Sequence, residues 1–227
     1  MKYLKIAVSC VLVILVGALL LASSVIESHF NRVARPGPYR VSVPVEQLHH
    51  RLIIADLHAD SLLWGRNLLS RSTRGHVDIP RMQEGNVAIQ AFTVVTKVPK
   101  HLNIDRNSAK TDEIRRLAIV ERWPPRTWNS PLQRALYQAE RLRGFAQKSG
   151  GEFNLLRTQK DVFDFLERRK GNSKLTSGFL GIEGSQALEG DLNNLDRPTT
   201  LVTAWFHLRT SLTRRSADLR PASRRVA

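Results

Sequence analysis

Apolar and polar residues alternate along the chain in a pattern that predicts strands separated by helices. Short apolar runs rich in β-branched residues predict buried strands at 52–56, 87–95 and 177–183, and residues 153–156 either pair with these strands or lead into one. Apolar residues spaced three or four apart predict helices at 107–122, 131–148 and 161–169. Strands that alternate with helices favour a parallel sheet with right-handed crossovers. The predicted fold class is therefore α/β.

The N-terminus carries the strongest apolar pattern in the sequence. Ile6–Ile26 contains 21 residues without a charge, enough for a helix to cross about 30 Å of hydrocarbon. Lys2 and Lys5 precede it, as expected of a cytoplasmic flank. A cleaved signal peptide is the alternative, with Ala22–Ser24 as a small-residue cleavage stretch, but the run is longer than the usual 7–15-residue core. In either case the remainder is expected to be exported and, if uncleaved, membrane-anchored through residues 6–26.

The composition divides the chain into four parts. Residues 1–27 are the predicted anchor or signal segment. Residues 28–47 are a predicted linker, because three prolines interrupt regular helix there. Residues 48–196 carry the strand and helix pattern. After Asp196 that pattern stops, and residues 197–227 are predicted to be a basic, disordered tail.

Charge and cysteine content limit the partners and the stabilising bonds that the sequence supports. The net charge of +15 invites a nucleic-acid or anionic-membrane interpretation. The tail alone holds seven arginines against one acidic residue, Asp218, and elsewhere the basic residues are scattered without interleaved aromatic residues. We therefore expect no nucleic-acid partner. Cys10 is the sole cysteine, so no intramolecular disulfide stabilises the exported part.

Two predicted strands end in side chains that bind metals. His58 and Asp60, two residues apart, follow the apolar run Leu52–Ala55, and Glu183 ends the run that starts at Gly178. In parallel α/β folds, functional sites lie at the carboxyl ends of the strands. The three residues are therefore candidate ligands of one metal ion. Taken singly, each also fits a solvated loop or turn position.

Other polar residues receive structural interpretations. Asp78 is expected to cap the turn at Ile79 and to pair with Arg81, which leaves His76 and Asp78 outside a second metal site. His49 and His50 are expected on the surface of a helix. Trp64 is expected to pack at the rim of the pocket.

Several of these motifs, in this order, resemble the membrane dipeptidases, also called renal dipeptidase-like zinc peptidases. They run from residue 50 to residue 196 and comprise Asp56–Asp60, Trp64, Gly75–Asp78, Arg81, Gly85, Gln90–Phe92 and Gly181–Gly184. The resemblance implies the N-terminal portion of a (β/α)8 TIM-type barrel, incomplete here, preceded by the transmembrane or signal helix. Ser185 stands where the family often has a second glycine.

The resemblance also implies a chemistry. His58 and Asp60 would bind a first zinc ion, and Glu183 would bridge it to a second, with water attacking a dipeptide. The further histidines and the acidic catalytic residue that the family uses have no counterpart in this sequence. We therefore expect at most one zinc ion, no catalytic residue beyond the metal ligands, and a truncated, inactive dipeptidase.

The change in composition after Asp196 suggests a frame shift near Arg197. Codons compatible with Pro198–Ala217 can be read in a shifted frame as a continuation like that of the family. Two alternatives stay open. One is a membrane-tethered binding protein whose basic tail contacts anionic lipid or nucleic acid. The other is a different metal-dependent amidohydrolase, which the His-x-Asp form disfavours.

Overall fold

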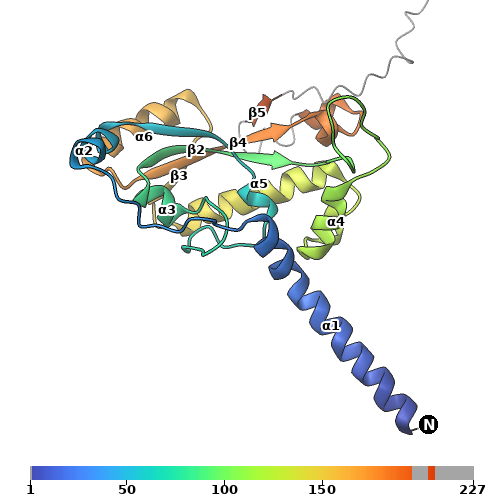
Figure 1. The fold of residues 1–227 in the computed structure, drawn as a ribbon. Helices are drawn as coiled ribbons and strands as arrows, with labels where there is room; N and C mark the ends of the chain where they lie inside the picture. The colour runs from blue at the N-terminus through green and yellow to red at the C-terminus, as the bar shows by residue number, and fades with distance from the viewer. Residues whose placement is uncertain (1, 196–203, 208–227) are drawn as a thin grey trace, which may run out of the picture.

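The computed structural model describes residues 2–195 and 204–207 (Figure 1). Its α-helices are α1 (Lys2–Phe30), α2 (Val43–Arg51), α3 (Ile79–Glu84), α4 (Glu113–Val120), α5 (Pro131–Lys148) and α6 (Gln159–Gly171). The strands are β1 (Ile54–Ala59), β2 (Val87–Val95), β3 (Phe153–Leu155), β4 (Thr176–Glu183) and β5 (Ala204–His207). Short 3-10 helices are η1 (Ser61–Leu63), η2 (Pro125–Thr127), η3 (Ser185–Leu188) and η4 (Leu192–Leu195).

The described strands form one parallel sheet in the order β1-β2-β4-β3, with β5 also paired to β4. β3 pairs with the first residues of β4, and β5 pairs with its last four. β2 runs along the whole opposite edge, from Ile89 opposite Ser177 to Val95 opposite Glu183. Every pairing is parallel, so the carboxyl ends of β1, β2 and β4 meet at one end of the sheet. This arrangement agrees with a partial TIM-type barrel.

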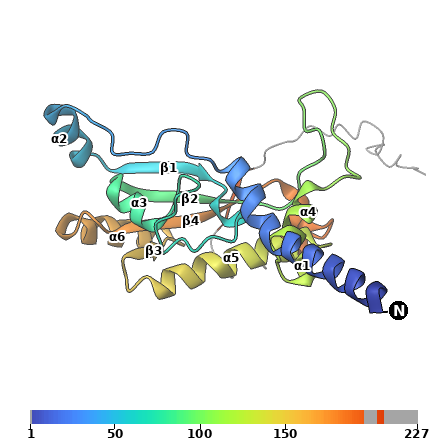
Figure 2. The same ribbon diagram turned by 60° about the horizontal axis from the view of Figure 1, so that its bottom comes forward.

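The main core lies between the sheet and α5, which runs alongside the strands (Figures 1 and 2). The apolar face of α5 buries Ala135, Ala139 and Leu142 against strand residues. Phe92 and Phe153 meet edge to face in this core, with ring centroids 5.8 Å apart. Position 178 has to be glycine here, because a Cβ atom would lie 2.6 Å from the Phe92 ring.

The expected strand at 52–56 is wrong in its burial and in its bounds. β1 begins at Ile54, and Leu52, Ile53 and Leu57 are exposed. The apolar run predicted a strand covered on both faces, as in a closed barrel. Among the described residues, however, β1 pairs only with β2, so its other edge and much of its side-chain surface stay uncovered.

The other predicted elements are present. The 131–148 helix is α5, the 161–169 helix is the centre of α6, and residues 153–155 join the sheet as β3. The predicted 107–122 helix is shorter, because Asp112 caps α4 by accepting a hydrogen bond from the Arg115 N–H. Within the predicted tail, 204–207 form β5 along β4, and the predicted disorder of the tail stays a prediction. The rest of the 197–227 segment lies outside the described residues.

A buried arginine ties α5 to the loops that follow β2. Arg134 is fully buried and donates hydrogen bonds to the carbonyls of Thr96, Thr127 and Trp128 at 2.6–2.7 Å. It also pairs with Asp112 at 2.6 Å. One side chain thereby satisfies acceptors from three segments that have no regular ladder of their own.

The first testable consequence concerns this arginine. Arg134→Ala removes one partner of a buried pair and leaves three carbonyls without their donor, so it should destabilise the fold by about 3–5 kcal/mol. Arg126→Ala is the control, because the Arg126–Glu140 pair is about half exposed and should change stability by less than about 1 kcal/mol. Urea denaturation of the full chain in detergent measures both. Equal midpoints for the two variants would contradict the structural role of Arg134.

A second consequence concerns pH. The Thr158 hydroxyl and the Asp161 carboxylate form a capping box at the start of α6. Partial burial raises the pKa of Asp161, but hydrogen bonds from Arg157 and Thr158 outweigh it and leave that pKa below its ordinary value. The carboxylate therefore stabilises the fold above its unfolded pKa and loses this contribution as pH falls through the folded value.

Asp161→Asn should consequently lower the melting temperature at neutral pH, and the difference from the parent chain should shrink below about pH 4. Thermal unfolding across pH 3–7 tests this. A difference that stays constant over that range would show that the charge of Asp161 contributes nothing to the cap.

Candidate metal centre

The first two candidate ligands come from the end of β1. The register of β1 against β2 shifts between Asp56 and Ala59, and the His58 N–H donates to the Asp56 carboxylate at 3.1 Å in this irregular stretch. Such irregularities redirect side chains next to functional sites. Asp60 follows directly, as the residue before η1.

The third candidate ligand, Glu183, is the last residue of β4. Gly184 then adopts a φ of +77°, which turns the chain out of the strand into η3. A residue with a side chain rarely adopts this conformation. The turn leaves the Glu183 side chain at the carboxyl end of the sheet, opposite Val95 of β2.

The structure brings the three predicted residues together. His58 Nε2 lies 2.8 Å from Glu183 Oε1 and 3.5 Å from Asp60 Oδ1. β1 and β4 are not neighbours, so these side chains meet above β2, which lies between them. The side chains of His58, Asp60 and Glu183 are 60%, 39% and 16% exposed, so the cluster is open on the His58 side and enclosed around Glu183.

Thr93 supports this cluster and was not identified from the sequence. It is buried in β2, and its hydroxyl donates a short hydrogen bond to Asp60 Oδ1. The bond occupies one lone pair of the carboxylate and orients the group towards His58. A threonine inside an apolar strand is typical of β structure in general, so the pattern alone could not single it out.

An arginine from α5 fixes the segment that follows Asp60. Arg141 donates to the carbonyls of Leu62, Trp64 and Arg66 at 2.5, 2.7 and 3.1 Å. Burial lowers the pKa of Arg141 from its ordinary value. Because three carbonyls within residues 62–66 share one donor group, the loop that leaves the site is held against α5.

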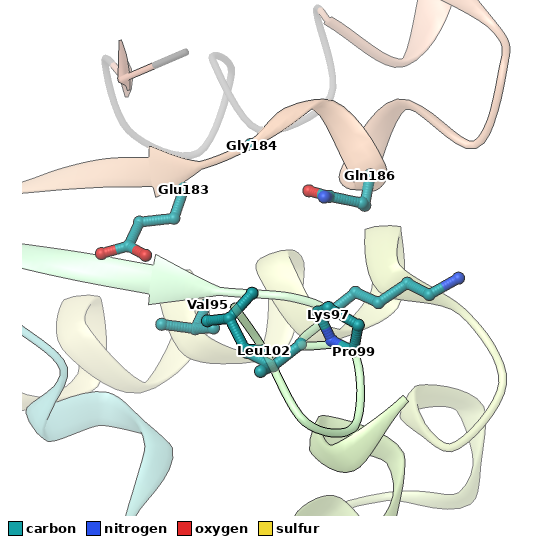
Figure 3. Close-up of a pocket in the computed structure, with 8 residues that line it drawn as sticks. Val95, Lys97, Pro99, Leu102, Glu183, Gly184 and Gln186 are labelled. Carbon is teal, nitrogen blue, oxygen red and sulfur yellow. The ribbon is translucent and has the colours of Figure 1, made fainter. Parts of the chain in front are cut away.

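A small pocket lies beside Glu183 (Figure 3). It has a volume of about 70 Å³ and is lined by apolar residues such as Val95, Pro99 and Leu102, with Lys97 and Gln186 at its edges. The Lys97 ammonium is directed away from the cluster and donates to the Ala109 carbonyl at 2.8 Å. The pocket therefore offers a small apolar surface next to the carboxylate.

The residues that were assigned structural roles keep those roles. Asp78 is fully buried, caps α3 by accepting from the Arg81 N–H at 3.0 Å, and pairs with the Arg81 guanidinium at 2.6 Å. His76 is exposed. His49 and His50 lie on α2, where the His49 ring contacts the Gly85 carbonyl at 3.0 Å. None of these side chains joins the cluster.

The cluster fits a divalent metal ion. Its possible ligand atoms all lie within 4.8 Å of one another. Atoms that bind one zinc ion at about 2.0–2.2 Å are at most about 4.4 Å apart, so small side-chain movements suffice. One imidazole and two carboxylates also match the ligands that zinc accepts. Among residues 2–195 and 204–207, this is the one group of three or more His, Cys, Asp and Glu side chains with such spacing.

The fold and the cluster define an α/β protein with a candidate metal centre at the carboxyl edge of a parallel sheet. The model of one family, "Membrane dipeptidase (Peptidase family M19)", matches residues 44–218. This match covers well over half of the chain, so the chain belongs to the membrane dipeptidase family. The match extends past Asp196, where the sequence predicted an unrelated tail, and that predicted boundary stays a prediction. A comparison with curated proteins returned no match.

Two of the solved structures that match this chain are metallopeptidases. One is the dipeptidase AC, a metallopeptidase of family M19, at 22% identity with a TM-score of 0.46. The other is a metallopeptidase from Rhodobacter sphaeroides with a phosphinate mimic of the dipeptide L-Ala-D-Ala, at 24% identity with a TM-score of 0.45. Each alignment covers 66% of this chain but only 40% and 43% of the relatives, so the chain spans about two fifths of their length.

The hydrogen bond from Thr93 to Asp60 can be tested through metal affinity. Thr93→Val keeps the shape of the side chain and removes the donor, which should weaken zinc binding about 10–100-fold. Thr96→Val is a matched control, because Thr96 is also buried and its hydroxyl has no hydrogen-bond partner in the described part of the chain. Competition with a chromogenic chelator gives both affinities. Equal losses in the two variants would mean that Thr93 does not orient Asp60.

Proposed function

We propose that this chain carries the first-metal part of a zinc-dependent dipeptidase site. The observation that supports this most strongly is the meeting of His58, Asp60 and Glu183 within 4.8 Å, at the strand ends of a chain that belongs to the membrane dipeptidase family. When bound, zinc supplies a Lewis acid that lowers the pKa of water to about 7 and polarises a carbonyl oxygen. The chain supplies the ligands and the surface around them.

Each residue has a defined task in this proposal. His58, Asp60 and Glu183 would hold the ion, with His58 on the open side of the cluster and Glu183 on the enclosed side. The hydroxyl of Thr93 would keep the Asp60 carboxylate oriented for binding. The apolar pocket of Val95, Pro99 and Leu102 beside Glu183 has room for a small substrate side chain, which suits short peptides.

The expected activity of this chain follows from its ligand count. The described residues provide three ligands, which suffice for one zinc ion. The two-zinc site that the family resemblance implies needs further histidines, and the described residues contain no second group of this kind. We therefore expect one zinc ion per chain and turnover far below that of a two-zinc dipeptidase.

The proposed membrane location rests on α1. Its 29 residues include an apolar window that is long enough to cross a bilayer, and none of the described side chains in that window is buried. We propose that α1 anchors the domain and that the site lies on the exported side. The alternative of a tethered binding protein depends on the basic tail, and no feature of the described residues favours it.

The decisive experiment measures zinc and ligand binding together. The purified chain should bind one zinc ion and, once loaded, a phosphinate analogue of L-Ala-D-Ala, as followed by calorimetry. Glu183→Gln should weaken zinc binding at least about tenfold, because a neutral amide is a poorer ligand. Glu167→Gln on the exposed surface of α6 is the control.

Dipeptide hydrolysis provides the second readout. Any release of alanine from Ala-Ala dipeptides should require zinc, should stop on chelation, and should be lost in Glu183→Gln but not in Glu167→Gln. If the phosphinate binds equally with and without zinc, or if Glu183→Gln leaves zinc binding unchanged, the proposed site is wrong.

A further inference from the structure

The last turns of α1 are fixed to the rest of the protein by polar contacts. The Ser23 hydroxyl donates to Glu121 at the end of α4, with an O–O distance of 2.8 Å. The Arg74 guanidinium donates to both the carbonyl and the hydroxyl of Ser24, at 2.7 and 2.9 Å. The domain therefore contacts α1 before the apolar run has ended.

A buried ion pair strengthens this attachment. Glu27 of α1 lies 2.6 Å from the Arg66 guanidinium, and both side chains are less than one tenth exposed. One turn later, the Gly75 N–H donates to the Asn31 carbonyl at 2.7 Å. A buried, paired carboxylate on an otherwise apolar helix fixes the position of that helix. The last turns of α1 thus contact the domain directly through an ion pair and hydrogen bonds.

An apolar groove runs between α1 and α4, next to these contacts. Its volume is about 330 Å³, and its apolar lining includes Ile26, Phe30, Trp64, Ile114, Leu117 and Val120. Phe30 stacks on Trp64 with ring centroids 6.3 Å apart, yet the Phe30 side chain is 71% exposed. The views in Figures 1 and 2 agree that α1 leaves the domain beside α4.

The length of α1 places this groove at the surface of a bilayer. The uncharged run from Ile6 to Ile26 spans about 31 Å at 1.5 Å per residue, which matches a hydrocarbon thickness of about 30 Å. Ile26 is both the last residue of that run and a wall of the groove. The groove therefore continues the lipid-facing surface of α1 into the domain.

The side chains at the rim of this groove indicate which kind of molecule it binds. Trp64, on which Phe30 stacks, is an aromatic residue of the kind that concentrates at the level of lipid headgroups. Arg116 lines the groove and pairs with Glu113 at 3.3 Å, and its neighbour Arg115 is exposed on α4. An apolar trough with a cationic side chain at its edge suits an acyl chain below a phosphate.

We propose that the α1–α4 groove holds an acyl chain of a bilayer phospholipid, with the headgroup phosphate near the arginines of α4. The domain then lies directly on the membrane through this face, and α1 is retained in the mature protein as part of the fold. This inference is independent of the metal centre and stands or falls without it.

Site-directed spin labelling of the full chain in phosphatidylglycerol-containing vesicles tests this proposal. In a Cys10→Ser background, Leu117→Cys places the label in the groove, and Val120→Cys is a second groove position in case the first variant fails to fold. Phe163→Cys is the control, since Phe163 is an exposed apolar residue on the distant α6. Collision of each label with oxygen and with a polar nickel complex reports its surroundings, and the intact mass reports whether α1 is retained.

The groove label should collide with oxygen more readily than with the nickel complex, and the label at position 163 should show the reverse order. The intact mass should show that α1 is retained. Preferential access of the nickel complex to the groove label would overturn the proposal, as would equal preference for oxygen at both positions or loss of α1. Signals that change when labelled protein is diluted with unlabelled protein would identify a second copy in the groove and would also overturn it.

Discussion

The alignment of the carboxyl ends of three parallel strands is the constraint on which the rest of the structure depends. β2 pairs with β1 on one side and with β4 on the other, in a register that brings Val95 opposite Glu183 and Phe92 opposite Ala59. Because neighbouring strands lie about 4.8 Å apart, ligands from β1 and β4 have to span two such steps. His58 and Glu183 do so above β2, and Thr93 lies beneath them to orient Asp60.

Arginines of α5 hold the loops around the site in place beside the aligned strands. Arg134 donates hydrogen bonds to carbonyl groups in the segments after β2, and Arg141 donates to carbonyl groups in the segment after Asp60. The same helix packs its apolar face against the sheet, so the core and the loops around the site share one support. Arg66 is linked to both elements, because its carbonyl accepts a hydrogen bond from Arg141 and its guanidinium pairs with Glu27 of α1. A series of direct contacts thus connects the proposed anchor to the loop next to the candidate metal ligands.

The apolar pattern was sufficient to predict α5, β2 and β4 and the meeting of His58, Asp60 and Glu183, since strand ends in a parallel sheet coincide. It was insufficient wherever a long-range partner decides the outcome. The run 52–56 reads as buried, but Leu57 and its neighbours are exposed because β1 has only one described neighbour. Residues 28–47 read as a linker, although α1 continues to Phe30, α2 begins at Val43, and the Asn31 carbonyl accepts a hydrogen bond from Gly75. Thr93 and Arg141 carry no local signal, because their roles depend on residues 33 and 79 positions away.

X-ray absorption spectroscopy of the zinc-loaded chain tests directly whether His58, Asp60 and Glu183 bind the metal. We expect one zinc ion with a first shell of nitrogen and oxygen at about 2.0–2.2 Å, a scattering contribution from one imidazole, and no sulfur. Loss of the imidazole contribution in His58→Ala would complete the assignment. A shell with two or more imidazoles, a sulfur ligand, or a spectrum unchanged in His58→Ala would contradict it.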